Sequence, residues 1–158
     1  PAGPGEAGEI WLKADSMMLG YLDDPAGTAA AFHDGWYRTG DVARIDEDGY
    51  LFIVDRTKDM IVTGGENVYS KEVEDALSAH PGVVEAAVVG RPHPEWGETV
   101  VAYVVAAKDA VLEAEALKTF LAERLAKYKI PRDFVLVEAL PHTPTGKIMK
   151  YKLRQEQG

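Results

Sequence analysis

Short runs of alternating apolar and polar residues predict extended backbone in the first third of the chain. Its predicted strands are Glu9–Lys13, Val42–Ile45 and Tyr50–Val54. The last two flank an Asp-Gly pair in which Gly49 supplies the positive-φ residue of a β-hairpin turn. One short helix is predicted over Asp23–Phe32, with Asp24 as its cap and Pro25 at its first position. This part is predicted to be mostly β, without an obvious core of its own.

After Arg56 the spacing of apolar positions changes. Helices are predicted over Ser70–Ala79, with Ser70 as the cap, and over Leu112–Leu125, because apolar residues recur there three or four positions apart. A short basic helix is predicted over Lys147–Gln155. The predicted strands are Met60–Thr63, Val83–Val89, Val100–Ala106 and Phe134–Val137. The second and third of these strands are rich in valine, which is typical of central strands covered on both faces.

These patterns predict an α+β fold with a domain boundary within Arg56–Asp59. We assign residues 1–57 to the mostly β part. We expect residues 58–158 to form a small domain, with a central sheet of about three strands, flanked by helices, and a β-hairpin.

Composition narrows the classes of function. The chain has 158 residues, a net charge of −9 and no cysteine, which disfavours a nucleic-acid binder and excludes disulfides and thiolate metal sites. None of the four histidines has a partner at metal-ligand spacing, so no metal site is expected. No signal peptide or membrane-spanning run is evident, and we expect a cytoplasmic protein. The net charge does not exclude one local basic site for a polyanion such as a nucleotide, and the last third of the chain supplies candidate residues: Lys127, Lys129, Arg132, Lys147, Lys150, Lys152 and Arg154.

Three short motifs carry the functional signal: Tyr37-Arg38-Thr39-Gly40-Asp41, Asp55-Arg56-Thr57-Lys58-Asp59 and Pro144-Thr145-Gly146-Lys147. In this order and spacing they resemble the C-terminal signature of adenylate-forming (AMP-binding) enzymes, in particular the acyl-CoA synthetases. The segments GGENVYSKEVE and PTGKIMK are most similar to those of fatty-acid–CoA ligases. The resemblance runs from about Gly8 to Arg154. It implies that residues 1–57 end a large N-terminal AMP-binding domain and that residues 58–158 form the small mobile C-terminal domain.

Asp41 and Arg56 stand at the two ends of the predicted hairpin, which returns the chain so that both side chains can face one site. A carboxylate at Asp41 can accept hydrogen bonds from two vicinal hydroxyls, as in ribose recognition. Taken alone, Asp41 would more simply stabilise a turn after Gly40. The resemblance implies that Asp41 and Arg56 hold the ribose of ATP and of the acyl-AMP.

Without the resemblance, the simplest interpretation of Lys58 and of Lys147 is an exposed lysine. The sequence around Lys147 is not a P-loop, because Pro141 and Ile148 stand where that motif needs Gly and Ser or Thr. The resemblance implies that Lys58 is the hinge about which the C-terminal domain rotates. It implies that Lys147 is catalytic in adenylation, where a fixed ammonium stabilises the charge of two reacting anions.

Gly64 and Gly65 read as a tight turn, and Trp96 as an aromatic that either stacks on a base or covers the edge of the core. The resemblance implies that Gly64 and Gly65 line a pantetheine tunnel and that Trp96 packs against the adenine of coenzyme A. It implies coenzyme A contacts for three further residues, Tyr128, Lys129 and Arg132.

The resemblance implies that the chain is the C-terminal part of an ATP-dependent acyl-CoA synthetase, with a fatty acid as the expected substrate. Its partners would be a small carboxylic acid, ATP with Mg²⁺, and coenzyme A. The chain alone is expected to be inactive and to bind none of these tightly. Two alternatives stay open: a nucleotide-binding or interaction module without catalysis, and an enzyme that loads a carrier-protein pantetheine. Acid chain length, oligomeric state and peripheral membrane contact are not readable from the residues.

Overall fold

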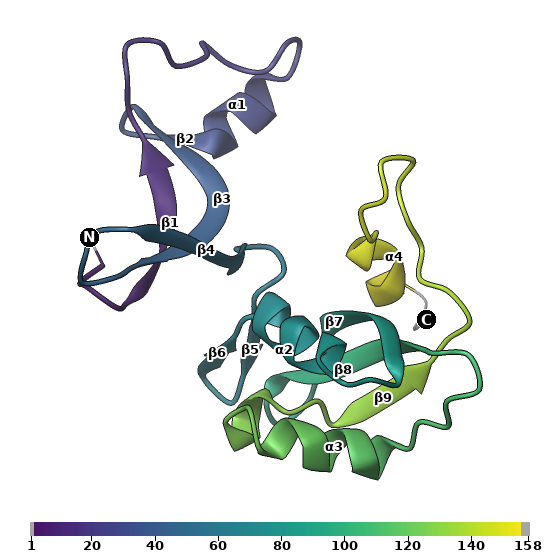
Figure 1. Cartoon of the computed structure of the whole chain (residues 1–158). Coiled ribbons are helices and arrows are strands. Elements are labelled where there is room, and N and C mark those ends of the chain that lie inside the picture. Colours follow the sequence, from purple (N-terminus) through teal and green to yellow (C-terminus); the bar gives the residue numbers. More distant parts are fainter. Residues whose placement is uncertain (1, 156–158) are drawn as a thin grey trace. The chain divides into compact units, whose positions relative to one another are not determined.

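The computed structural model describes residues 2–155, which divide between Lys58 and Asp59 into two compact units (Figure 1). The structure is mixed α+β. No helix within residues 2–155 is both long enough and apolar enough to cross a membrane.

The first unit is built around one long strand, β3, which pairs antiparallel with the three others. The strands are β1 (Ala7–Leu12), β2 (Phe32–His33), β3 (Trp36–Ile45) and β4 (Leu51–Arg56). Helix α1 (Pro25–Ala31) begins at the predicted cap, where the Asp24 carboxylate accepts a 2.8 Å hydrogen bond from the Gly27 N–H. The predicted β character and hairpin are confirmed. Two details were wrong: Phe32 leaves the helix for β2, and β3 begins six residues before Val42.

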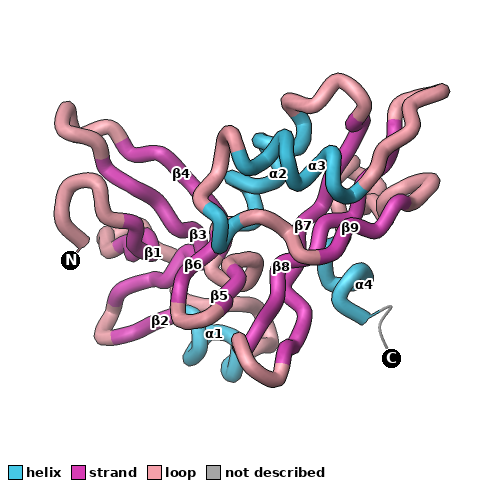
Figure 2. The backbone as a smooth tube through the Cα atoms, turned by 90° about the horizontal axis from the view of Figure 1, so that it is seen from below, coloured by secondary structure: helices cyan, strands magenta, loops and turns pink. Residues whose placement is uncertain are grey.

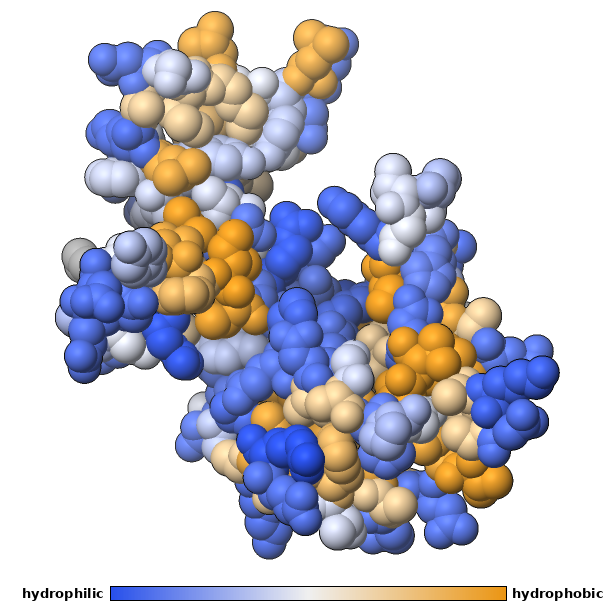
Figure 3. Space-filling model, in the orientation of Figure 1, coloured by the Kyte–Doolittle hydropathy of each residue, from blue (hydrophilic) through white to orange (hydrophobic). Residues whose placement is uncertain are grey.

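The first unit has little core of its own. Only Val42 and Ala43 among its described apolar side chains are buried. Large apolar side chains such as Leu22, Phe52 and Ile53 are exposed, and Figure 3 shows hydrophobic side chains gathered on its surface. Both clusters of buried apolar side chains belong to the second unit, as the sequence pattern predicted.

The second unit contains a five-stranded sheet rather than the predicted sheet of about three strands. Its strands are β5 (Ile61–Thr63), β6 (Glu66–Val68), β7 (Val83–His93), β8 (Gly97–Ala106) and β9 (Asp133–Leu136). They follow the order β6-β5-β8-β7, and β9 pairs parallel with β8. The prediction missed β6, which turns back on β5 directly after Gly65. Strand β8 is central, but β7 pairs only with β8 among the described residues and is therefore an edge strand.

Helices cover both faces of this sheet (Figure 2). Helices α2 (Ser70–Ser78) and α3 (Ala114–Ala122) pack on the face that carries Val88, Val100, Ala102 and Val104. The opposite face carries Val89, Val101 and Tyr103 and is covered by Leu140 and by Leu153 of α4 (Lys150–Gln155). Alternate residues of β8 thus face two different cores, which explains the continuous apolar run.

The helix boundaries of this unit differ from prediction. The cap of α2 is Tyr69, while Ser70 is the first helical residue and its buried hydroxyl accepts a hydrogen bond from Lys150 instead. Helix α3 ends at Ala122, before the predicted Leu125, and the Arg124 N–H bonds to the Leu121 carbonyl three residues earlier, which tightens the last turn. A single 3₁₀ turn, η1 (Lys127–Lys129), follows.

Candidate functional site

Asp41 and Arg56 lie directly opposite one another in the β3–β4 ladder. The Arg56 Nε lies 3.2 Å from the Asp41 Oδ1, and both side chains keep access to solvent, with 54% of the Arg56 surface and 34% of the Asp41 surface exposed. The hairpin therefore brings the two predicted ribose-binding residues together within the first unit. Their partly exposed ion pair can exchange with hydroxyl groups of a ligand.

The backbone before Asp41 bulges away from β1. Thr39, Gly40 and Asp41 stand opposite the single residue Ile10, and Gly40 has a φ of 74°. The Thr39 hydroxyl donates to the Ile10 carbonyl at 2.9 Å and accepts from the Asp41 N–H at 3.1 Å. The Gly40 N–H donates to the Glu9 carboxylate at 3.2 Å. Side chains thus replace the ladder bonds that the bulge removes.

Lys147 lies on an exposed turn just before α4, not inside a helix as predicted. The Thr143 hydroxyl accepts from the Lys147 N–H at 3.1 Å, and the Thr143 N–H donates to the Lys147 carbonyl at 2.8 Å. Gly146 has a φ of 84°, which closes the turn. Within residues 2–155 the Lys147 ammonium forms no ion pair, so it is presented to solvent on a hydrogen-bonded turn.

Helix α4, which follows this turn, is anchored by largely buried charges. The Lys150 ammonium lies 2.7 Å from both the Glu74 carboxylate and the Ser70 hydroxyl of α2. Arg154 lies 2.7 Å from Asp59, the first residue of the second unit. These contacts fix α4, the helix that follows the Lys147 turn, to the body of its unit.

Gly64 and Gly65 form the two-residue turn between β5 and β6, with φ angles of 58° and 84°. A side chain at Gly64 would meet the ring of Trp96 at 3.3 Å, whereas nothing lies within 4 Å of a Cβ at Gly65. The two glycines are therefore constrained differently. The Gly64 N–H also donates to the Trp96 carbonyl at 2.9 Å, which ties this turn to the β7–β8 connection.

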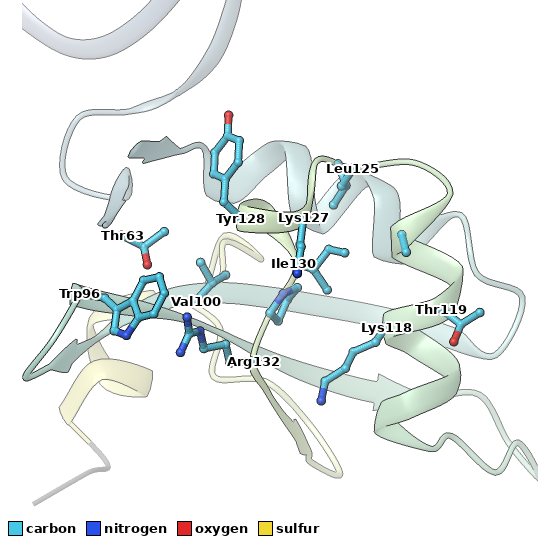
Figure 4. Close-up of a pocket in the computed structure, with 12 residues that line it drawn as sticks. Thr63, Trp96, Val100, Lys118, Thr119, Leu125, Lys127, Tyr128, Ile130 and Arg132 are labelled. Carbon is cyan, nitrogen blue, oxygen red and sulfur yellow. The ribbon is translucent and has the colours of Figure 1, made fainter. Parts of the chain in front are cut away.

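Trp96 stands at one side of a pocket of about 1080 Å³ in the second unit (Figure 4). Its ring lies 3.9 Å from the Arg132 guanidinium, and its Nε1–H donates to Glu95 at 2.9 Å. Trp96 is still 36% exposed. The pocket is lined by Thr63, Trp96, Val100, Lys118, Thr119, Ala122, Leu125, Lys127, Tyr128, Ile130, Pro131 and Arg132. Apolar and aromatic walls with cations among them suit a flat ring that carries phosphate groups.

The structure does not gather all the candidate basic residues at one site. Lys129 binds both carboxylate oxygens of Glu72, at 2.7 and 2.8 Å, and does not line the pocket. Lys150 and Arg154 are held in the pairs described above. Tyr128 and Arg132 do line the pocket, and Lys58 is exposed at the end of the first unit.

The sequence reasoning missed three residues. It gave no role to Glu9, whose carboxylate reaches the bulge before Asp41. It missed Glu74, which is largely buried beside Lys150, and it missed Lys118 in the wall of the pocket. No local motif marks Glu9 or Glu74, because Gly40 and Lys150, which they contact, are distant in sequence. Lys118 pairs with the nearby Glu115, and that local pair gives no sign of the pocket. No group of three metal-ligating side chains occurs within the described part of the chain.

Residues 72–147 match the AMP-binding enzyme C-terminal domain. The chain contains the C-terminal domain of an AMP-binding enzyme. It is homologous to acid–CoA ligases, as the motifs predicted. It is 46% identical to the long-chain-fatty-acid–CoA ligase FadD13 of Mycobacterium tuberculosis over 149 residues, which are 94% of this chain and 29% of FadD13.

Solved structures agree with this assignment. The o-succinylbenzoate CoA synthetase MenE of Bacillus subtilis, in complex with its acyl-adenylate intermediate, superposes with a TM-score of 0.87 at 38% identity, over 97% of this chain and 31% of MenE. The amide bond synthetase McbA of Marinactinospora thermotolerans gives 0.88 at 42% identity, over 99% of this chain and 32% of McbA. The chain therefore spans about a third of the length of its relatives.

Proposed function

We propose that this chain is the C-terminal part of an ATP-dependent acid–CoA ligase, which forms an acyl-adenylate and then an acyl-CoA thioester. The observation that carries the proposal is the alignment of nearly the whole chain with MenE, a CoA synthetase that holds an acyl-adenylate. The candidate residues fit the two half-reactions. A fatty acid is the substrate class we favour, because of the likeness to FadD13.

In adenylation, Asp41 and Arg56 would hold the ribose, and Lys147 would approach the α-phosphate. The Asp41 carboxylate can accept from both ribose hydroxyls while Arg56 stays beside it. The ammonium of Lys147 stabilises charge that develops when the acid attacks, and it needs to transfer no proton. Bound ATP would enter as its Mg²⁺ complex, whose metal ligands are expected elsewhere in the enzyme.

In thioester formation, the pocket of the second unit would hold the nucleotide end of coenzyme A. The adenine would stack on Trp96, and Arg132 would contact a phosphate. Tyr128 lies in the same pocket. Lys129 would have to leave Glu72 in order to reach a phosphate.

The turn and the hinge complete the proposal for this second step. Gly64 and Gly65 would pass close to the pantetheine, where a backbone without side chains leaves room. Lys58 would be the hinge that exchanges the two faces of the domain between the half-reactions.

The test uses the full-length enzyme and a panel of acids. ATP/pyrophosphate exchange reports adenylation, and acyl-CoA formation reports the second step. We expect both activities, with fatty acids as the best substrates. Exchange without acyl-CoA would point to another acceptor, such as an amine, as the name of McbA suggests, or a carrier-protein pantetheine. No exchange with any acid would contradict the proposed function and leave a nucleotide-binding module as the explanation.

A further inference from the structure

The bulge before Asp41 depends on a residue from another strand. Its two inner N–H groups, those of Gly40 and Asp41, have lost strand partners and bond to side chains instead. One acceptor, Thr39, belongs to the bulge itself. The other is Glu9, which lies on β1 at the position where the register between β1 and β3 shifts.

Glu9 is held by several donors at once. Its Oε2 accepts from the Trp11 indole at 2.8 Å and from the Nε and Nη2 atoms of Arg38 at 3.2 and 3.1 Å. Its Oε1 accepts from the Gly40 N–H at 3.2 Å. The Glu9 side chain is only 17% exposed. A carboxylate with so many donors has one defined position, and Gly40 is fixed with it.

The charge state of Glu9 agrees with this geometry. Burial raises the pKa of its carboxyl, but the hydrogen bonds from Trp11, Arg38 and Gly40 and the charge of Arg38 together lower it by more, so the pKa lies below the usual 4.5. Glu9 is therefore an anion at neutral pH, as the four donors require.

We propose that Glu9 is a positioning residue for Asp41: it holds the Thr39–Asp41 bulge in the conformation that places the Asp41 carboxylate opposite Arg56. The inference deepens the proposed function, since it rests on Asp41 as the ribose-binding residue. In this role Glu9 would contact neither substrate nor reacting atoms, since its carboxylate is held by Trp11, Arg38 and Gly40. Its effect reaches the nucleotide only through the backbone of Gly40 and Asp41.

The first measurement does not depend on activity. Amide hydrogen exchange of Gly40 and Asp41 in this chain should become at least about tenfold faster in Glu9→Ala, because the bulge loses its clamp. Glu9→Gln should lie in between, since its amide oxygen can still accept from Gly40. Glu47→Ala, an exposed glutamate in the hairpin turn, is the control and should change neither amide. Unchanged exchange at Gly40 and Asp41 in Glu9→Ala would overturn the proposal.

The second measurement uses the full-length enzyme in ATP/pyrophosphate exchange. Glu9→Ala should raise KM for ATP by about tenfold, with a smaller change in kcat, and should reduce the preference for ATP over 2′,3′-dideoxy-ATP to a similar extent. In an Asp41→Ala background, Glu9→Ala should have no further effect on KM. Equal losses in both backgrounds would show a merely structural role and refute positioning. If the parent shows no exchange activity, the proposed function fails, while the hydrogen-exchange result still decides whether Glu9 positions Asp41.

Discussion

Replacing Glu74 by leucine should be among the most damaging single changes in the second unit. The Glu74 carboxylate lies 2.7 Å from the Lys150 ammonium and accepts a 2.7 Å hydrogen bond from the Val88 N–H. Both side chains are largely buried, since only 14% of the Glu74 surface and 15% of the Lys150 surface are exposed. Glu74→Leu would leave a buried ammonium and an unpaired N–H.

The magnitude follows from this burial. Removing one partner of a buried ion pair costs about 3–5 kcal/mol, and the remaining solvent access of Lys150 places the expected loss at about 3 kcal/mol. In Glu74→Leu/Lys150→Met both charges are gone, so most of the loss should be recovered. About 1 kcal/mol should remain for the Val88 N–H bond.

The assay is urea unfolding of the chain, followed by the fluorescence of Trp96 with Trp11 and Trp36 replaced by phenylalanine. Asp75→Leu is the matched control, because its pair with Lys71 lies on the same helix but is exposed, and it should cost less than about 0.5 kcal/mol. The reasoning would be refuted by equal losses for Glu74→Leu and Asp75→Leu, or by a double variant no more stable than Glu74→Leu.

Three further predictions concern the sites. Gly65→Leu should abolish acyl-CoA formation and spare adenylation. Gly49→Leu is the control, because Gly49 has the same φ of 84° and equally open surroundings, so it should carry the same backbone strain and spare both activities. If Gly65→Leu keeps both activities, the tunnel assignment is contradicted. Arg132→Ala should raise KM for coenzyme A by about tenfold, as expected for the loss of one charged contact, without changing KM for ATP. Steady-state kinetics measure both constants, and a raised KM for ATP with an unchanged KM for coenzyme A would contradict this prediction. Because the pKa of Glu9 is lowered on folding, its stabilising effect should be complete above about pH 4.5 and vanish as the pH falls through the folded pKa. Unfolding measured against pH for the parent and Glu9→Gln should therefore converge in acid, and a constant difference would count against the clamp.

Local patterns predicted most of the elements. The Asp24 cap, the hairpin around Gly49 and the apolar stripe with Leu117 and Leu121 all depend on residues close in sequence. The errors occurred where tertiary contacts decide. Ser70 has the right chemistry for a cap, but its hydroxyl is taken by Lys150, which is distant in sequence.

The candidate site shows the same division. The motifs named Asp41, Arg56 and Lys147, and the hairpin placed the first two together. The partner of Lys129 was not predictable, because Glu72 lies on α2, 57 residues earlier in the chain. Such pairs depend on the way helices and turns pack on the sheet, which periodicity does not encode.

The most direct test of the central claim compares the two half-reactions in a Lys147→Ala variant of the full-length enzyme. Adenylation, measured by ATP/pyrophosphate exchange, should slow by about 3 kcal/mol, the scale of one preorganised electrostatic contact. Acyl-CoA formation from supplied acyl-AMP should be almost unchanged, because in the proposed function Trp96 and Arg132, not Lys147, serve that step. Lys108→Ala, which changes a lysine elsewhere in the unit, should affect neither. Equal slowing of both half-reactions by Lys147→Ala would contradict the account.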